Sequence, residues 1–148
     1  MTLRLSLLSL RIAIGLQAVL MFAQAASAGG FLGGHFDLLA IHGTLGRALT
    51  VVTLLTTVAA FFVRRLGGPR SVFPVSAVMV VALVGQIALG IAHSVAAHVL
   101  LGVTLVSAGA VLAHQVLTTP LPSGAEVPEA AAPVLASDEA VVEPEPSR

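Results

Sequence analysis

The chain contains 148 residues, 57% of them hydrophobic and only 9% charged, and its seven basic and seven acidic residues give a formal net charge of zero. Because a soluble domain carries about 25% charged residues, this composition excludes an ordinary soluble globular protein. The chain has no cysteine, which excludes disulfides, thiolate metal sites and a cysteine nucleophile. It also lacks a basic cluster of the kind that binds nucleic acid.

Four hydrophobic stretches are each long enough to cross a bilayer, which requires about 20 apolar residues. They cover approximately 5–27, 40–63, 72–93 and 96–117. None of them alternates polar and apolar residues as a membrane β-strand does, and lipid offers the backbone no hydrogen-bond partner, so each is predicted to be a helix. The predicted fold is therefore all-α, an integral membrane four-helix bundle formed by residues 1–117.

The first stretch also fits a secretory signal peptide. Arg4 and Arg11 precede an apolar run, and residues 26–28, Ala-Ser-Ala, have the small side chains of a cleavage site. Against cleavage, Gln17 and Gln24 interrupt the run, and removing it would take a packing partner from the other three helices. Residues 1–28 are thus either a cleaved signal or a retained helix, and we favour the retained helix.

The arginines predict the orientation. Arg4 and Arg11 lie at the start of the first stretch, and Arg64, Arg65 and Arg70 lie between the second and third stretches, whereas the other two connections contain no arginine. The positive-inside rule places the arginine-bearing side in the cytoplasm. We expect a multi-pass protein of a bacterial plasma membrane, with both termini in the cytoplasm and the lipid bilayer as its principal partner.

Residues 118–148 differ from the rest of the chain. They contain six of the eight prolines and every acidic residue except Asp37. With no apolar period, this segment cannot bury enough surface to offset its chain entropy. It is predicted to be a disordered cytoplasmic tail rich in Pro, Ala and Glu.

Two histidines share a local pattern, because His42 and His98 are each followed four residues later by a glycine, Gly46 and Gly102. Four residues apart, the two side-chain positions lie on one helix face. A glycine there removes the side chain one turn below the imidazole and lets a neighbouring backbone or a flat cofactor approach.

The two histidines are also predicted to lie at the same depth. His42 is 22 residues before Arg64, and His98 is 22 residues before Pro120, a rise of about 33 Å in each case. Both imidazoles then lie near the outer edge of the hydrocarbon. If the second and fourth helices face each other, the pair can bind one haem iron from both sides, as helix bundles commonly do.

Two further residues complete this predicted site. Arg47, five residues after His42, is suited to bind a haem propionate, although an arginine that snorkels to the interface is an alternative. Gln86 lies on the third stretch, on one face with Gly90 and His93. The first hypothesis is a small b-type haem protein for electron transfer or haem handling, with a redox or membrane-complex partner.

Two alternatives stay open. His35 and His93 also lie at the outer rim, and with His42 and His98 they would form a cluster that binds zinc or copper. In the other alternative the histidines only pack or face the interface, and the protein is a scaffold or accessory subunit without a cofactor. Asp37 is the only acidic residue outside the tail, so the sequence disfavours an enzyme and offers no catalytic residue; it does not indicate the oligomeric state.

The stretch Gln86-Ile-Ala-Leu-Gly90, followed by His98-Val-Leu-Leu-Gly102, resembles one four-helix half of heme A synthase, and Gln17 and Ile41-His42-Gly43 resemble its first two helices. The resemblance implies ligand histidines on the second and fourth helices, here His42 and His98. The chain departs from that family in having one bundle, in having residues 39–41 in place of an acidic residue, and in having Gly43 in place of an arginine. The chain is also similar to small four-helix membrane proteins of high-GC actinobacteria.

Overall fold

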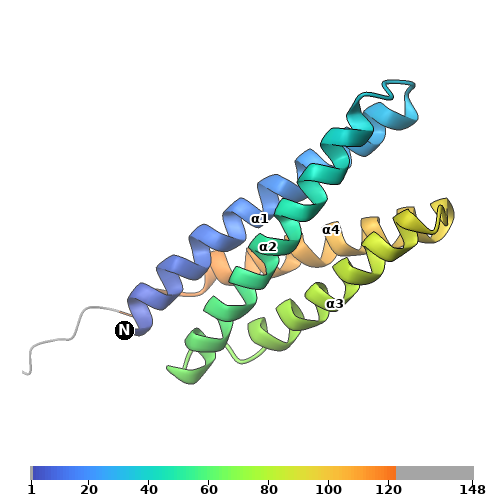
Figure 1. Cartoon of the computed structure of the whole chain (residues 1–148). Helices are drawn as coiled ribbons and strands as arrows, with labels where there is room; N and C mark the ends of the chain where they lie inside the picture. Colours follow the sequence, from blue (N-terminus) through green and yellow to red (C-terminus); the bar gives the residue numbers. More distant parts are fainter. Residues whose placement is uncertain (1, 123–148) are drawn as a thin grey trace, which may run out of the picture.

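The computed structural model of the protein describes residues 2–122, which form four helices and no strand (Figure 1). The helices are α1 (Leu3–Leu32), α2 (Leu38–Arg65), α3 (Val72–Ile91) and α4 (Val95–Thr118). The all-α, four-helix prediction is confirmed, and each predicted stretch is a helix. Met1 and residues 123–148, and with them nearly all of the predicted tail, lie outside the described residues.

All four helices are long and apolar enough to cross a membrane. The shortest, α3, has 20 residues and therefore a length of about 30 Å, the thickness of the hydrocarbon layer. α1 has 30 residues and continues past the end that its hydrophobic stretch predicts. Gly30 permits this, because a Cβ at that position would overlap the side chain of Leu38 at the start of α2. The connection between α1 and α2 therefore shortens to residues 33–37.

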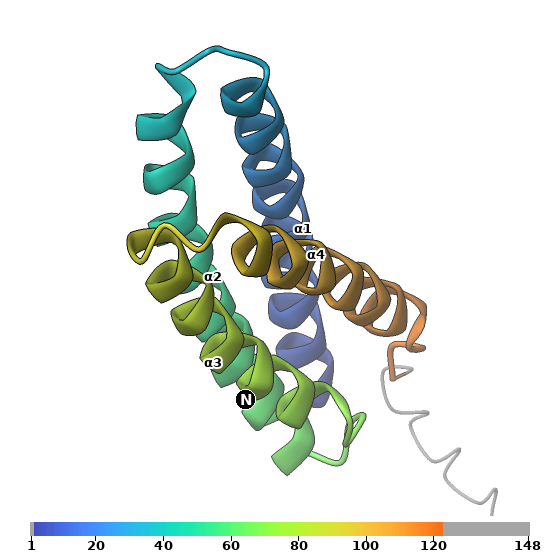
Figure 2. The same cartoon turned by 90° about the vertical axis from the view of Figure 1, so that its right-hand side faces the viewer.

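The helices form a closed ring in which each packs against two neighbours. α1 contacts α2 and α4, and α3 contacts the same two helices, so that α1 is diagonal to α3 and α2 is diagonal to α4. Two hairpins, α1–α2 and α3–α4, thus make up the bundle. We call the end with the 66–71 connection the arginine end, and the end with the 33–37 and 92–94 connections the histidine end. The hairpins come together at the arginine end, and their tips lie apart at the histidine end (Figures 1 and 2).

The apolar core is concentrated toward the arginine end. Its most deeply buried side chains come from all four helices: Leu7, Leu10, Ile14, Ala60, Val63, Val72, Leu112 and Val116. Arg11 closes this end, because its guanidinium donates hydrogen bonds to the carbonyl oxygens of Val116 and Thr119 at the end of α4. A helix C-terminus leaves its last carbonyls without helical partners, and a cation there also interacts favourably with the negative end of the helix dipole.

Candidate functional site

The structure brings His42 and His98 together at the histidine end. Their ring centroids are 6.1 Å apart and their planes are inclined at 60°. The two rings come from α2 and α4, which lie diagonally across the ring of helices. The condition that the sequence analysis set for a shared site, that the second and fourth helices bring these two histidines face to face, is therefore met.

Hydrogen bonds to α3 orient the His98 ring. Its Nδ1 lies 2.9 Å from the backbone carbonyl oxygen of Gln86, and the Gln86 side-chain amide donates in return to the backbone carbonyl of His98, at 2.8 Å. Gly90 lets the ring lie against α3, because a Cβ there would be 3.2 Å from His98 Cε1. A carbonyl oxygen only accepts, so His98 Nδ1 is the donor in this hydrogen bond.

The His42 ring is held in the same way against α1. Its Nδ1 lies 3.2 Å from the backbone carbonyl oxygen of Gln24 and 3.2 Å from Ser27 Oγ. The Ser27 hydroxyl itself donates to the Gln24 carbonyl, at 2.9 Å, so Nδ1 is the donor toward both oxygens. Nε2 then accepts from the side-chain amide of Gln24, at 3.2 Å. In both histidines Nδ1 is therefore the donor toward a glutamine carbonyl.

The two hairpins carry the same arrangement. In each one, a glutamine carbonyl on the first helix accepts from a histidine Nδ1 on the second, and the glycine one turn after the histidine faces the glutamine amide. A Cβ at Gly46 would lie 3.2 Å from Gln24 Nε2, and one at Gly102 would lie 2.9 Å from Gln86 Nε2. The histidine pair thus lies where two similar half-sites meet, which differ in that the Gln24 amide donates to the His42 ring and the Gln86 amide to the His98 backbone carbonyl. Sequence reasoning missed Gln24 and Ser27 as members of the site.

The two glycines leave room one turn from each histidine, as the sequence predicts, and in this structure the side-chain amides of Gln24 and Gln86 fill that room. A larger residue at either position would displace the amide that lies next to the histidine.

The predicted four-histidine cluster is wrong. Within residues 2–122, no three His, Asp or Glu side chains lie close enough to hold a metal ion together. His35 and His93 are exposed and belong to the tips of different hairpins, which diverge (Figure 1). His93 also ends α3 with a left-handed backbone, φ 56°. A position at the same end of the bundle did not bring these side chains together.

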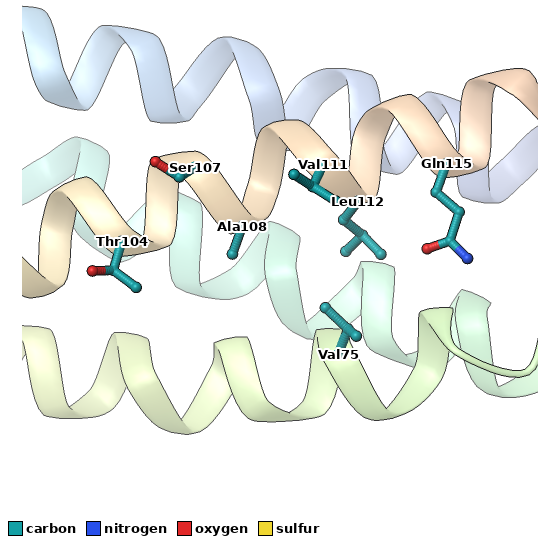
Figure 3. Close-up of a pocket in the computed structure, with 7 residues that line it drawn as sticks. All are labelled: Val75, Thr104, Ser107, Ala108, Val111, Leu112 and Gln115. Carbon is teal, nitrogen blue, oxygen red and sulfur yellow. The ribbon is translucent and has the colours of Figure 1, made fainter.

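Arg47 is exposed, and its guanidinium donates to Thr44 Oγ1 on its own helix, at 3.1 Å. Two shallow grooves lie elsewhere on the surface, and neither is lined by a histidine. One, of about 290 Å³, lies on the outer half of α2. The other, of about 380 Å³, lies between α3 and α4, where Val75 faces a row of α4 side chains (Figure 3).

Comparison of the chain with protein-family profiles, with curated proteins and with solved structures finds no match.

Proposed function

We propose that this small integral membrane protein binds one b-type haem between His42 and His98 and serves in electron transfer or haem handling. The observation that carries the proposal is the separation of the two rings, 6.1 Å between centroids. A metal–imidazole bond of about 2 Å, plus about 1 Å from the nitrogen to the ring centre, separates two imidazole centres by about 6 Å across one iron.

The tautomers support the same proposal. A metal-binding histidine commonly donates its second ring N–H to a carbonyl or carboxylate, which fixes the ring and makes the ligating nitrogen more basic. His42 and His98 both have their Nδ1 atoms tied to glutamine carbonyls. Nε2 is therefore the nitrogen of each ring that would bind iron, and in His42 the rotatable amide of Gln24 would first have to leave Nε2.

The shape of the bundle supports entry of a flat ring. The hairpins diverge at the histidine end (Figures 1 and 2), and α2 does not pack directly against α4. A porphyrin would enter from this end, with Gln24 and Gln86 swinging aside. Among residues 2–122 the Arg47 guanidinium is bound by one hydroxyl, that of Thr44 on its own helix, so it has further donors for a propionate.

A bound haem would supply a one-electron Fe(III)/Fe(II) couple. If His42 and His98 both bound the iron, they would leave no position for oxygen or a substrate, and this favours electron transfer over catalysis. We also propose that the arginine end faces the cytoplasm of a bacterial plasma membrane, with α1 retained, because Arg64, Arg65 and Arg70 lie at that end.

One observation favours a second candidate, a scaffold without a cofactor. The Gln24 amide already satisfies His42 Nε2, so the histidines could serve as a polar cross-link between the hairpins. In that case the spectrum of the protein would show no haem, and its role would lie in binding a membrane partner.

An absorption spectrum distinguishes the two candidates. The protein is produced with added haem precursor, purified in detergent and titrated with haemin. We expect a Soret band of six-coordinate haem that is lost in His42→Ala and in His98→Ala, and kept in His114→Ala, which removes an exposed histidine of α4 far from the pair. A colourless wild-type protein after the titration, or equal binding by all variants, would refute haem ligation by this pair.

A further inference from the structure

The two half-sites differ at the histidine nitrogen that a metal would use. In the first hairpin, the side-chain amide of Gln24 lies 3.2 Å from Nε2 of His42. In the second hairpin, the amide of Gln86 donates to the backbone carbonyl oxygen of His98, at 2.8 Å, and not to its ring. The first amide therefore occupies the ligating nitrogen of its histidine, whereas the second amide binds elsewhere.

The Gln24 amide occupies Nε2 whichever way the amide is turned. With its NH₂ group toward the ring, it donates to Nε2; turned over, its oxygen would accept the Nε2 proton of a charged ring. In either case a metal must break this hydrogen bond before it binds His42. If the Gln86 amide moves when a ligand enters, it breaks a bond to the backbone and leaves Nε2 of His98 unaffected.

The His98 ring also has a closer backbone neighbour. A Cβ at Gly90 would lie 3.2 Å from Cε1 and 3.3 Å from Nδ1 of His98, so this ring lies directly against the backbone of α3. The same position of the first hairpin, four residues after its glutamine, is Ala28. A ring held equally close to α1 would meet the Cβ of Ala28, so the first hairpin cannot hold its histidine as tightly.

The hydrogen bonds at Nδ1 agree with this difference in packing. Nδ1 of His98 lies 2.9 Å from one acceptor, the carbonyl oxygen of Gln86. Nδ1 of His42 lies between two oxygens, the Gln24 carbonyl and Ser27 Oγ, each at 3.2 Å. The His98 ring is thus fixed by one short hydrogen bond, and the His42 ring is held more loosely.

We propose that His98 is the permanent axial ligand of this site and His42 the exchangeable one, with Gln24 as the positioning residue that competes with iron for the His42 ring. The inference deepens the proposed haem function and rests on it. One such hydrogen bond changes an equilibrium constant by about fivefold, which is enough to order the two ligands without preventing both from binding. An exchangeable ligand favours haem handling, in which a bound haem is passed on, over electron transfer, in which both ligands stay bound.

Haemin affinity in single-histidine backgrounds tests the proposal. His98→Ala leaves only His42 as a ligand, and His42→Ala leaves only His98. Gln24→Leu, which removes the amide and keeps the backbone carbonyl that binds Nδ1, is added to each. We expect it to raise the haemin affinity of His98→Ala by about fivefold and to give no gain in His42→Ala. Gln86→Leu should give no such gain in either background, because the Gln86 amide does not occupy a ring nitrogen.

Titration of the reduced protein with carbon monoxide gives a second readout. Carbon monoxide forms an Fe–C bond in place of the Fe–N bond to one histidine, and the iron stays Fe(II). If His42 is the histidine that leaves, its ring regains the hydrogen bond to Gln24, so Gln24→Leu should lower the carbon monoxide affinity by about fivefold. A general loosening of the bundle would instead weaken haemin binding and ease the entry of carbon monoxide, so the predicted pair of changes distinguishes competition from a structural effect.

The outcomes separate this inference from the proposed function. If the wild type binds haemin but Gln24→Leu has equal effects in both single-histidine backgrounds, the ligand order is overturned and the haem site stands. An unchanged or higher carbon monoxide affinity in Gln24→Leu overturns it in the same way. A wild type that binds no haemin overturns the proposed function and the ligand order together. If Gln24→Leu does not fold, Gln24→Met takes its place.

Discussion

Replacing Gly102 by alanine tests whether the glutamine amide holds the histidine half-site together. The added Cβ would lie 2.9 Å from Gln86 Nε2, too close for van der Waals contact, so the amide must move away from the His98 carbonyl that it binds at 2.8 Å. The amide is the end of a flexible side chain, and its displacement costs little by itself. The loss of stability comes from the broken hydrogen bond between the Gln86 amide and the His98 carbonyl.

The expected magnitude follows from two opposing effects. Alanine favours a helix over glycine by about 1 kcal/mol. The broken bond, which leaves buried polar groups unpaired, costs about 2 kcal/mol. Gly102→Ala should therefore destabilise the bundle by about 1 kcal/mol. Gly85→Ala is the matched control, since a Cβ there meets only Leu101 Cδ2 at 3.9 Å and should gain about 1 kcal/mol.

The assay is equilibrium unfolding of the haem-free protein in mixed micelles, with the helical circular dichroism signal followed against the fraction of SDS. The two variants should differ by about 2 kcal/mol in the free energy of unfolding. If Gly102→Ala is as stable as Gly85→Ala, the Gln86–His98 hydrogen bond contributes nothing to the site, and the argument about the glycines fails.

Three further outcomes are expected. Arg11→Met should lower the free energy of unfolding by about 1–2 kcal/mol in the same assay, because the carbonyls of Val116 and Thr119 lose a charged donor; unchanged stability would contradict this. His93→Gly should raise it by about 1 kcal/mol, because φ is 56° at this residue and only glycine adopts the left-handed region without cost; a decrease would count against the turn geometry. The intact mass of the purified protein should include residues 1–28, because α1 supplies buried core residues; a mass matching cleavage after residue 28 would show a signal peptide.

The positions of the helices follow from the sequence because lipid imposes a simple requirement, a long apolar run with satisfied backbone groups. The equal depth of His42 and His98 also follows, since the helical rise is fixed at about 1.5 Å per residue. The end of α1 was harder to predict. Gly30 is typical of a turn, but here it is where α2 packs closest, and that contact exists only in the folded hairpin.

The partners of the histidines could not be predicted in the same way. Gln24 and Ser27 reach His42 across a turn, and the sequence does not fix the register between two helices. The repeat offers part of the signal that was missed, because His42 and His98 are each preceded by a glutamine, Gln24 and Gln86, although the distance is 18 residues in the first hairpin and 12 in the second. For His35 and His93 the sequence indicated the correct end of the bundle but could not give their lateral positions.

The two hairpins are similar at the histidine layer and differ two turns further toward the arginine end, where Gln17 and Thr53 correspond to Met79 and Gly109. Haem ligation by His42 and His98 does not involve this lower layer. The double variant Gln17→Met, Thr53→Ala makes this layer apolar throughout and changes no residue of the histidine layer. It should therefore bind haemin with the affinity of the wild type in the titration, whereas loss of the Soret band in this variant would show that the two layers form one site.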